Sequence, residues 1–330
     1  MLLECHADAC HNGGGKGVEV DENHPGRTRQ WLAAAIKLLI VALVVWYIRR
    51  TIVDAWEQLG AHRWHFHAGW LVVSGGLYLL ATLLCGIFWH RVLRALGQPV
   101  GLMQTLRAYY VGHLGKYVPG KAMVVILRTG LIRGQGVDTA LAAVSVFFET
   151  LTMMSTGALM AAAIVAVWFH EQRLLFWAAM AMMVAAGAPT LPPVFRRLVR
   201  LVGVGKMNPA AAEKLANLGY GTMFFGWVLT GLGWAILGLG FWAALRGLGA
   251  VNADPFEQLH LYTAAVTLAT VAGFVSFVPG GAVVREAVLT EVTAPFLGGA
   301  VALVGAILSR LVWLVSELLI SGILYFTTRR

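Results

Sequence analysis

The chain has 330 residues, of which 58% are hydrophobic and 12% are charged, and its formal net charge is +9. Few soluble proteins have this composition, and long apolar runs in a chain of this length predict several membrane-spanning helices. The excess of Lys and Arg is typical of cytoplasmic loops that face anionic lipid. Since no basic run is long, we expect no nucleic-acid partner. The cysteines Cys5, Cys10 and Cys85 are odd in number, so no disulfide framework is predicted.

Residues 1–30 form a polar, glycine-rich tail, for which we expect disorder. The string CHADACH at 5–11 has a longer spacing than a haem attachment motif. The string GGGKG at 13–17 lacks the preceding strand and the following Ser or Thr of a phosphate-binding loop. The histidines of AHRWHFHAGW are interpreted as part of an interfacial loop. We therefore predict no metal site and no cofactor.

Apolar runs after this tail predict about six full crossings. They cover residues 31–48, 70–89, 140–168, 176–194, 221–245 and 298–326. Asp138 comes directly before the third run and is a suitable N-cap. The string ADPFE at 253–257 predicts another helix start, with Asp254 as the cap and Pro255 in the first turn.

Two further apolar segments, 102–134 and 258–296, are each interrupted by Pro and Gly. YVPGKAMV in the first aligns with FVPGGAVV in the second at an offset of 160 residues, and the flanking helices align at roughly the same offset. The chain is therefore predicted to be an all-α polytopic membrane protein in one transmembrane domain, 31–330, built from two repeats at about 31–170 and 176–328. Each repeat contains a broken segment that is either re-entrant or a hairpin.

Basic residues predict the orientation of the two repeats. Arg196, Arg197, Arg200, Lys206 and Lys214 indicate that the loop 195–220 is cytoplasmic, and Arg329-Arg330 indicate the same for the C-terminus. Counting the crossings back from the loop 195–220 to the start of the chain places the N-terminus in the cytoplasm as well. The first broken segment then begins and ends inside and the second outside, so the repeats are expected to have inverted topology.

The two breaks predict a substrate site. Backbone groups released by Pro and Gly survive at membrane depth only where they are buried in protein or line a wet cavity, and paired breaks in inverted halves are typical of a midplane site in transporters. Charged residues at this depth are functional candidates. The candidate substrate-binding residues are Arg285, Glu286, Lys121, Arg128, Pro119, Gly120, Pro279, Gly280 and Gly281.

Glu149 and Arg310 lie at nearly equivalent depths in the long helices after the two breaks. We predict that they form a structural ion pair between the halves. Arg285 and Glu286 also have a purely structural alternative, in which they form an ion pair that holds the halves together.

The string FVPGGAVVREAVL, with LSRLVWLVSELL about 24 residues further on, resembles the membrane domain of lysylphosphatidylglycerol synthase-type proteins. The residues that match the family's second repeat are Pro279, Gly280, Gly281, Arg285, Glu286 and Arg310. LGKYVPGKAMVVILRTGLI resembles its first repeat, although this chain has Glu149-Thr150 where the family often has Glu-Arg. The resemblance covers about residues 31–327 and implies a lipid flippase-like fold. No soluble aminoacyl-transferase domain is expected, so no synthase activity is carried over.

The expected function is therefore a flippase-like one in a bacterial or archaeal plasma membrane, in which an anionic phospholipid or a polyprenyl-phosphate lipid is bound or moved. One alternative is a non-catalytic partner or scaffold of a lipid- or glycan-modifying enzyme. The third is a membrane enzyme that acts on glycosyl or prenyl lipids. Its Mg²⁺ would need clustered carboxylates. The aspartates are scattered instead, which favours a protein that is not an enzyme: Asp8, Asp21, Asp54, Asp138 and Asp254.

Overall fold

The structure is a computed structural model. It describes residues 66–118, 122–134, 136–168, 173–201, 213–251, 254–276, 278 and 281–327. The described residues form α-helices and short 3₁₀-helices. In chain order these are α2 (Ala68–Ala95), α3 (Leu102–His113), η1 (Leu114–Tyr117), α4 (Ala122–Ile132), α5 (Thr139–Trp168), α6 (Arg173–Gly187), η2 (Ala188–Thr190), α7 (Pro192–Leu201), α10 (Tyr220–Gly247), α11 (Leu259–Val275), α12 (Val284–Leu297) and α13 (Gly299–Thr327).

Four of these helices, α2, α5, α10 and α13, are long and apolar enough to cross a membrane. They correspond to predicted crossings, and the chain is an integral membrane protein. The crossing predicted at 176–194 differs, because α6 has only 15 residues and the chain passes through η2 before α7 begins at Pro192. Pro189 and Pro192 end a continuous helix there, since proline lacks the N–H that the helix needs. The run 31–48 lies outside the described residues.

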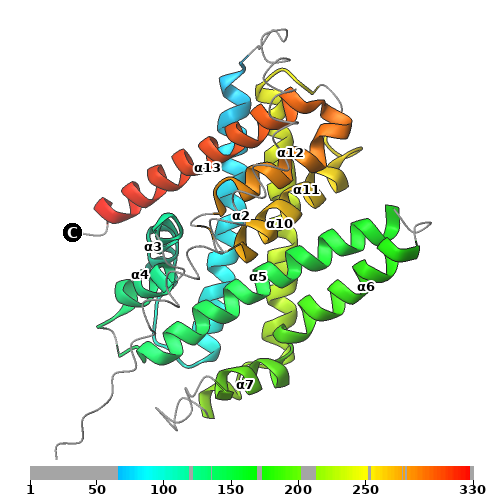
Figure 1. Ribbon diagram of the computed structural model, residues 1–330. Coiled ribbons are helices and arrows are strands. Elements are labelled where there is room, and N and C mark those ends of the chain that lie inside the picture. Colours follow the sequence, from blue (N-terminus) through cyan, green and yellow to red (C-terminus); the bar gives the residue numbers. More distant parts are fainter. Residues whose placement is uncertain are drawn as a thin grey trace, which may run out of the picture.

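The pair α2 and α10 forms the axis of the molecule (Figure 1). Glycines of α10 recur every seven residues, at Gly226, Gly233, Gly240 and Gly247, and each faces α2. Their neighbours are, in the same order, Phe88, Ala81, Leu77 and Leu71, so the two helices run antiparallel. Small residues at this spacing let two membrane helices approach closely.

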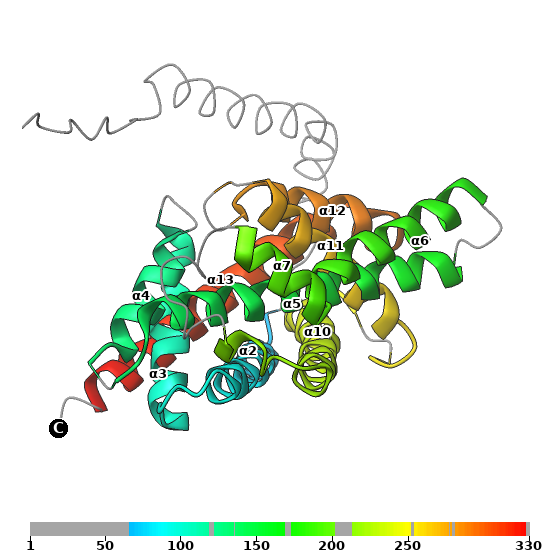
Figure 2. The ribbon, with the colours of Figure 1, turned by 90° about the horizontal axis from the view of Figure 1, so that it is seen from below.

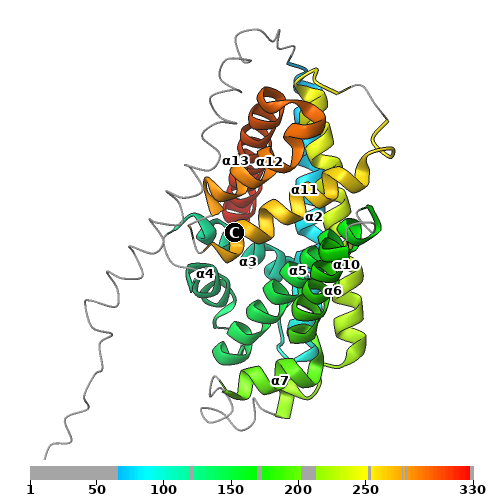
Figure 3. The same ribbon diagram turned by 45° about the vertical axis from the view of Figure 1, so that its right-hand side comes forward.

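Most of the other helices form two sets with the same order of elements. In the first, α3, η1, α4 and the long α5 follow α2; in the second, α11, α12 and the long α13 follow α10. Figure 2 views α2 and α10 nearly along their axes, with the remaining helices spread across one side. In Figure 3, α12 and the start of α13 lie in the upper part of the molecule and α7 lies at the bottom, while α11 and α5 meet in the middle. In Figure 1, α5 and α13 run in opposite directions.

The starts of the helices agree in part with the sequence. Asp138 Oδ1 accepts hydrogen bonds from the N–H groups of Ala140 at 2.8 Å and Leu141 at 3.2 Å, which confirms the predicted cap of α5. Asp254 Oδ1 accepts a hydrogen bond from the Phe256 N–H at 2.9 Å, but it stabilises a turn, and α11 begins only at Leu259.

Candidate functional site

A cavity of about 280 Å³ lies where the two broken segments approach each other. From the first set it is lined by residues of α3, η1, α4 and α5, and from the second by residues of α11, α12 and α13. Most lining residues are apolar. The ionisable exceptions are Tyr78, Tyr109, His113, Lys116, Arg128, Glu149 and Arg285.

The first charged group in the cavity is an ion pair between α4 and α5. Arg128 Nη1 donates to Glu149 Oε2 at 2.7 Å, and both side chains are only 2% exposed. Glu149 accepts further hydrogen bonds from the hydroxyls of Tyr109 at 3.2 Å and Thr150 at 3.3 Å. The Arg128 guanidinium carbon lies 3.9 Å from the ring centroid of Tyr109 and 5.3 Å from that of Trp89. This pair has the partners that a buried carboxylate needs.

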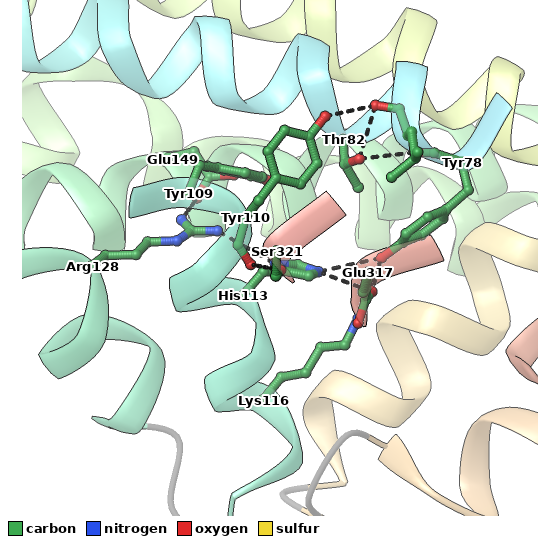
Figure 4. Close-up of polar contacts among 11 residues, drawn as sticks. Tyr78, Thr82, Tyr109, Tyr110, His113, Lys116, Arg128, Glu149, Glu317 and Ser321 are labelled. Carbon is green, nitrogen blue, oxygen red and sulfur yellow. Dashed lines mark hydrogen bonds and ion pairs between the residues drawn. The ribbon is translucent and has the colours of Figure 1, made fainter. Parts of the chain in front are cut away.

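The second charged group joins the two sets of helices. Glu317 of α13, 2% exposed, accepts hydrogen bonds from Lys116 of η1 and from the Tyr78 hydroxyl of α2. Its Oε1 also lies 3.7 Å from Nε2 of His113. Among the described residues, its other oxygen is buried without a hydrogen-bond partner. Figure 4 shows this cluster, with His113 lying between Glu317 and Arg128.

The third charged group belongs to the second broken segment. Arg310 of α13 donates to Glu286 of α12 at 2.5 Å, and the two side chains are 22% and 17% exposed. Arg285 lies next to Glu286 in sequence but stacks on Trp313 instead, with its guanidinium carbon 4.0 Å from the ring centroid. Within the described part of the chain, no carboxylate lies within ion-pair distance of Arg285.

Glycines bring the two arms of each broken segment together. A Cβ on Gly115 would lie 2.9 Å from the Val124 nitrogen, and one on Gly281 would lie 3.0 Å from the Gly273 Cα, so neither position has room for a side chain. Gly281 has φ +65°, a conformation that glycine adopts readily.

The chain enters α12 through a strained residue. Val283 has φ 68° and ψ −51°, and the N–H of Val284 donates to the carbonyl of Ala282 at 2.8 Å. This combination defines a γ-turn of the rare, strained kind, and a β-branched residue is poorly suited to it.

The structure corrects the predicted ion pair. Glu149 pairs with Arg128 and Arg310 pairs with Glu286, so Glu149 and Arg310 do not pair with each other. Each residue finds its partner in its own broken segment, because α4 packs on α5 and α12 packs on α13. Polar contacts between the sets come instead from Glu317, which accepts hydrogen bonds from Lys116 and Tyr78, and from Ser321, which donates to the carbonyl of Tyr110.

The predicted substrate-binding residues have different outcomes. Arg128, Arg285 and Gly281 line the cavity, whereas Glu286 is engaged by Arg310. Five others lie outside the described residues: Pro119, Gly120, Lys121, Pro279 and Gly280. Four further residues of the site were not predicted from the sequence: Tyr78, Tyr109, His113 and Trp313. An aromatic or neutral polar residue in an apolar helix is also common in a structural core, so these residues gave no distinguishing signal.

The charges of the site favour an anion. Three cations, Lys116, Arg128 and Arg285, line the cavity, and two carboxylates, Glu149 and Glu317, neutralise the first two. The Arg285 guanidinium lies over the Trp313 ring, and a cation–π contact of this kind does not consume N–H donors. The donors of this group match the oxygens of a phosphate or carboxylate.

Comparison with models of known protein families identifies a match. The profile of the family described as lysylphosphatidylglycerol synthase TM region covers residues 34–321. No curated protein matches the chain. Because the profile spans most of its length, the chain belongs to the lysylphosphatidylglycerol synthase transmembrane-region family.

Proposed function

We propose that the cavity binds the phosphate-bearing headgroup of an anionic lipid and that the chain moves this lipid between leaflets. The observation that carries the proposal is Arg285, which lines the cavity and has no carboxylate within ion-pair distance in the described part of the chain. A cation at membrane depth without a counter-ion is unfavourable, so an anionic ligand supplies the missing charge.

The size of the cavity supports a headgroup rather than a whole lipid. Its volume of about 280 Å³ lies at the lower limit of typical small-molecule pockets. Val118, Phe147 and Phe274 line it and are also exposed, so apolar surface continues from the cavity to the outside of the protein. The acyl or prenyl chains then remain in the bilayer.

The arrangement of the two sets of helices supports movement between leaflets. The long helices α2 and α10 occupy equivalent places in the order of elements and run antiparallel. Equivalent helices of opposite direction are what inverted halves require, and inverted halves around a shared site allow it to open to each side in turn.

The proposal is tested with purified protein in liposomes that contain a trace of fluorescent lipid, with a membrane-impermeant quencher reporting movement to the outer leaflet. Separate preparations carry labelled phosphatidylglycerol, labelled polyprenyl phosphate or zwitterionic phosphatidylcholine. We expect movement of at least one of the two anionic lipids, and the comparison identifies which. Arg285→Gln is expected to reduce the rate about tenfold or more, since a charged hydrogen bond contributes about 1.5–3 kcal/mol. Arg285→Lys should be nearly as slow, because a point charge cannot replace a planar two-pronged contact.

The matched control is Arg91→Gln, because Arg91 is exposed near the end of α2 and lies outside the cavity. It should move lipid at the wild-type rate. Equal rates for Arg285→Gln and wild type would refute a transport site at Arg285. No movement of any lipid by the wild type would favour the scaffold alternative, and formation of a modified lipid by the purified protein alone would favour an enzyme.

A further inference from the structure

His113 lies at the end of α3 and lines the cavity, with each of its ring nitrogens facing a different ion pair. Nδ1 lies 3.4 Å from Nη2 of Arg128, which belongs to the pair with Glu149. Nε2 lies 3.5 Å from the Tyr78 hydroxyl and 3.7 Å from Oε1 of Glu317, which is paired with Lys116. The imidazole therefore connects the buried pair of the first set with the cluster that joins the two sets (Figure 4).

The chemistry of Arg128 determines the protonation of His113. A guanidinium has only donors, so the contact from Nη2 requires Nδ1 to accept. The ring proton must then be on Nε2, directed at Tyr78 and Glu317. In this conformation His113 is a neutral imidazole whose one basic lone pair, on Nδ1, faces a cation.

Charged and titratable groups surround this imidazole from every element packed on it. The cations Lys116 of η1, Arg128 of α4 and Arg285 of α12 act on it electrostatically. Glu317 of α13 is the carboxylate within ion-pair distance of the ring in the described residues. Tyr109, in its own helix, stacks on the ring with centroids 5.8 Å apart, and Tyr78 of α2 completes the shell. Glu149 of α5 acts through Arg128, which it neutralises.

An anion at Arg285 changes this balance. It offsets the cation that has no carboxylate near it, which reduces the electrostatic cost of adding a positive charge to the ring. A proton added to Nδ1 ends the contact with Arg128, which keeps Glu149 as its partner. The imidazolium then competes with Lys116 for Oε1 of Glu317, and Lys116 becomes available to the anion.

We propose that His113 is a proton-binding site coupled to the headgroup site, so that the cavity takes up an anionic headgroup together with one proton. This inference rests on the proposed function, because it uses the same cavity. The proton comes from the buffer in the solvent, which becomes its conjugate base, and it forms an N–H bond at Nδ1, while no covalent bond of the lipid changes. The coupling is reciprocal, so a bound anion favours the proton and a bound proton favours the anion.

The test is a binding measurement on the full chain in detergent. The probe is dihexanoyl phosphatidylglycerol, whose phosphodiester stays ionised between pH 5.5 and 8.5, titrated calorimetrically in buffers of different ionisation enthalpy. For the wild type we expect proton uptake on binding, and an affinity that falls by up to about tenfold per pH unit where His113 titrates. His113→Gln keeps a polar side chain but cannot titrate, and its binding should vary little with pH and take up no proton. His67→Gln is the control, since His67 is exposed and outside the cavity.

The outcomes separate the two proposals. Wild-type binding that is equally strong at all pH values, without proton uptake, would overturn the coupling and leave the headgroup site in place. Proton uptake that persists in His113→Gln would overturn the assignment to His113. Failure of dihexanoyl phosphatidylglycerol and of short-chain prenyl phosphate to bind at any pH would overturn both the headgroup site and the coupling.

Discussion

The arginine–glutamate pairs of the two sets of helices differ in burial and in hydrogen bonding. Arg128 and Glu149 are almost fully buried and receive additional hydrogen bonds from Tyr109 and Thr150. The pair of Arg310 and Glu286 is partly exposed, and in the described structure one oxygen of Glu286 is buried without a partner. In the first pair both carboxylate oxygens are hydrogen-bonded and, among the described residues, only Nε of Arg128 lacks a partner, whereas in the second pair a carboxylate oxygen is left without one.

This difference indicates a structural role for the first pair and a ligand-binding role for the second broken segment. The buried pair holds α4 on α5, and it leaves little capacity for a ligand because both oxygens of Glu149 accept hydrogen bonds and only Nε of Arg128 lacks a partner among the described residues. In the second set, the pairing of Glu286 with Arg310 leaves Arg285 to face the cavity without a carboxylate partner among the described residues. Similar motifs in the two sets of helices therefore have different environments. Four substitutions test this comparison.

The largest effect on stability is expected for Glu149→Gln, which leaves Arg128 as an uncompensated buried charge. Removal of one partner of such a pair typically costs about 3–5 kcal/mol. The free energy of unfolding in mixed micelles measures it. The double variant Arg128→Met/Glu149→Gln should lose less free energy of unfolding than Glu149→Gln alone, since it also removes the unpaired charge of Arg128. Additive losses would mean that the two residues act independently.

Gly281→Ala tests the close approach of α11 and α12. The new Cβ would lie 3.0 Å from Gly273 Cα at φ +65°. We expect a loss of about 2–3 kcal/mol, because the left-handed conformation costs about 1–2 kcal/mol and overpacking adds to it. The control is Gly130→Ala in α4, where nothing lies within 4 Å, which should be neutral or stabilising. A neutral Gly281→Ala would show that this hairpin is looser than described.

Asp138→Ala should destabilise the start of α5 by about 1 kcal/mol, the usual contribution of an N-cap. The measurement is the same micellar unfolding. Asp138→Asn retains an accepting oxygen and should retain most of the stability. The equivalent helix α13 begins after Gly298, whose φ is +81°, so its start depends on backbone conformation instead. If Asn destabilises as much as Ala, the contribution of Asp138 is its charge and not the cap.

The smallest effect is expected for Arg310→Gln. Its ion pair with Glu286 is partly exposed, and partly solvated pairs contribute about 1 kcal/mol or less. The comparison between the sets predicts that this loss is several-fold smaller than that of Glu149→Gln. A loss as large as that of Glu149→Gln would remove the distinction between the two pairs.

The sequence predicts the long helices well because their signal is local. An apolar run of membrane length leaves few alternatives to a helix, and Asp138 lies where the backbone needs an acceptor. The helix expected at 176–194 is shorter in the structure, since prolines interrupt it at positions that hydropathy alone does not weigh.

The site is less predictable because ion pairing depends on packing. Glu149 has two arginines at plausible depth, and only the contact of α4 with α5 selects Arg128 over Arg310. His113 and Tyr78 are neutral groups in apolar helices, and their role arises from lying beside Glu317, more than 200 residues away for each. Arg285 was identified because its charge follows a Pro-Gly break, which is a signal that a single sequence contains.

The γ-turn at Val283 has an energetic consequence for the second set. A residue held in a sparsely populated backbone region typically costs about 1–3 kcal/mol, which corresponds to about 5- to 150-fold in an equilibrium between two conformations. Any movement of α12 that relaxes Val283 recovers this free energy. The described conformation, in which Arg285 lines the cavity, therefore depends on packing of α12 that offsets this cost.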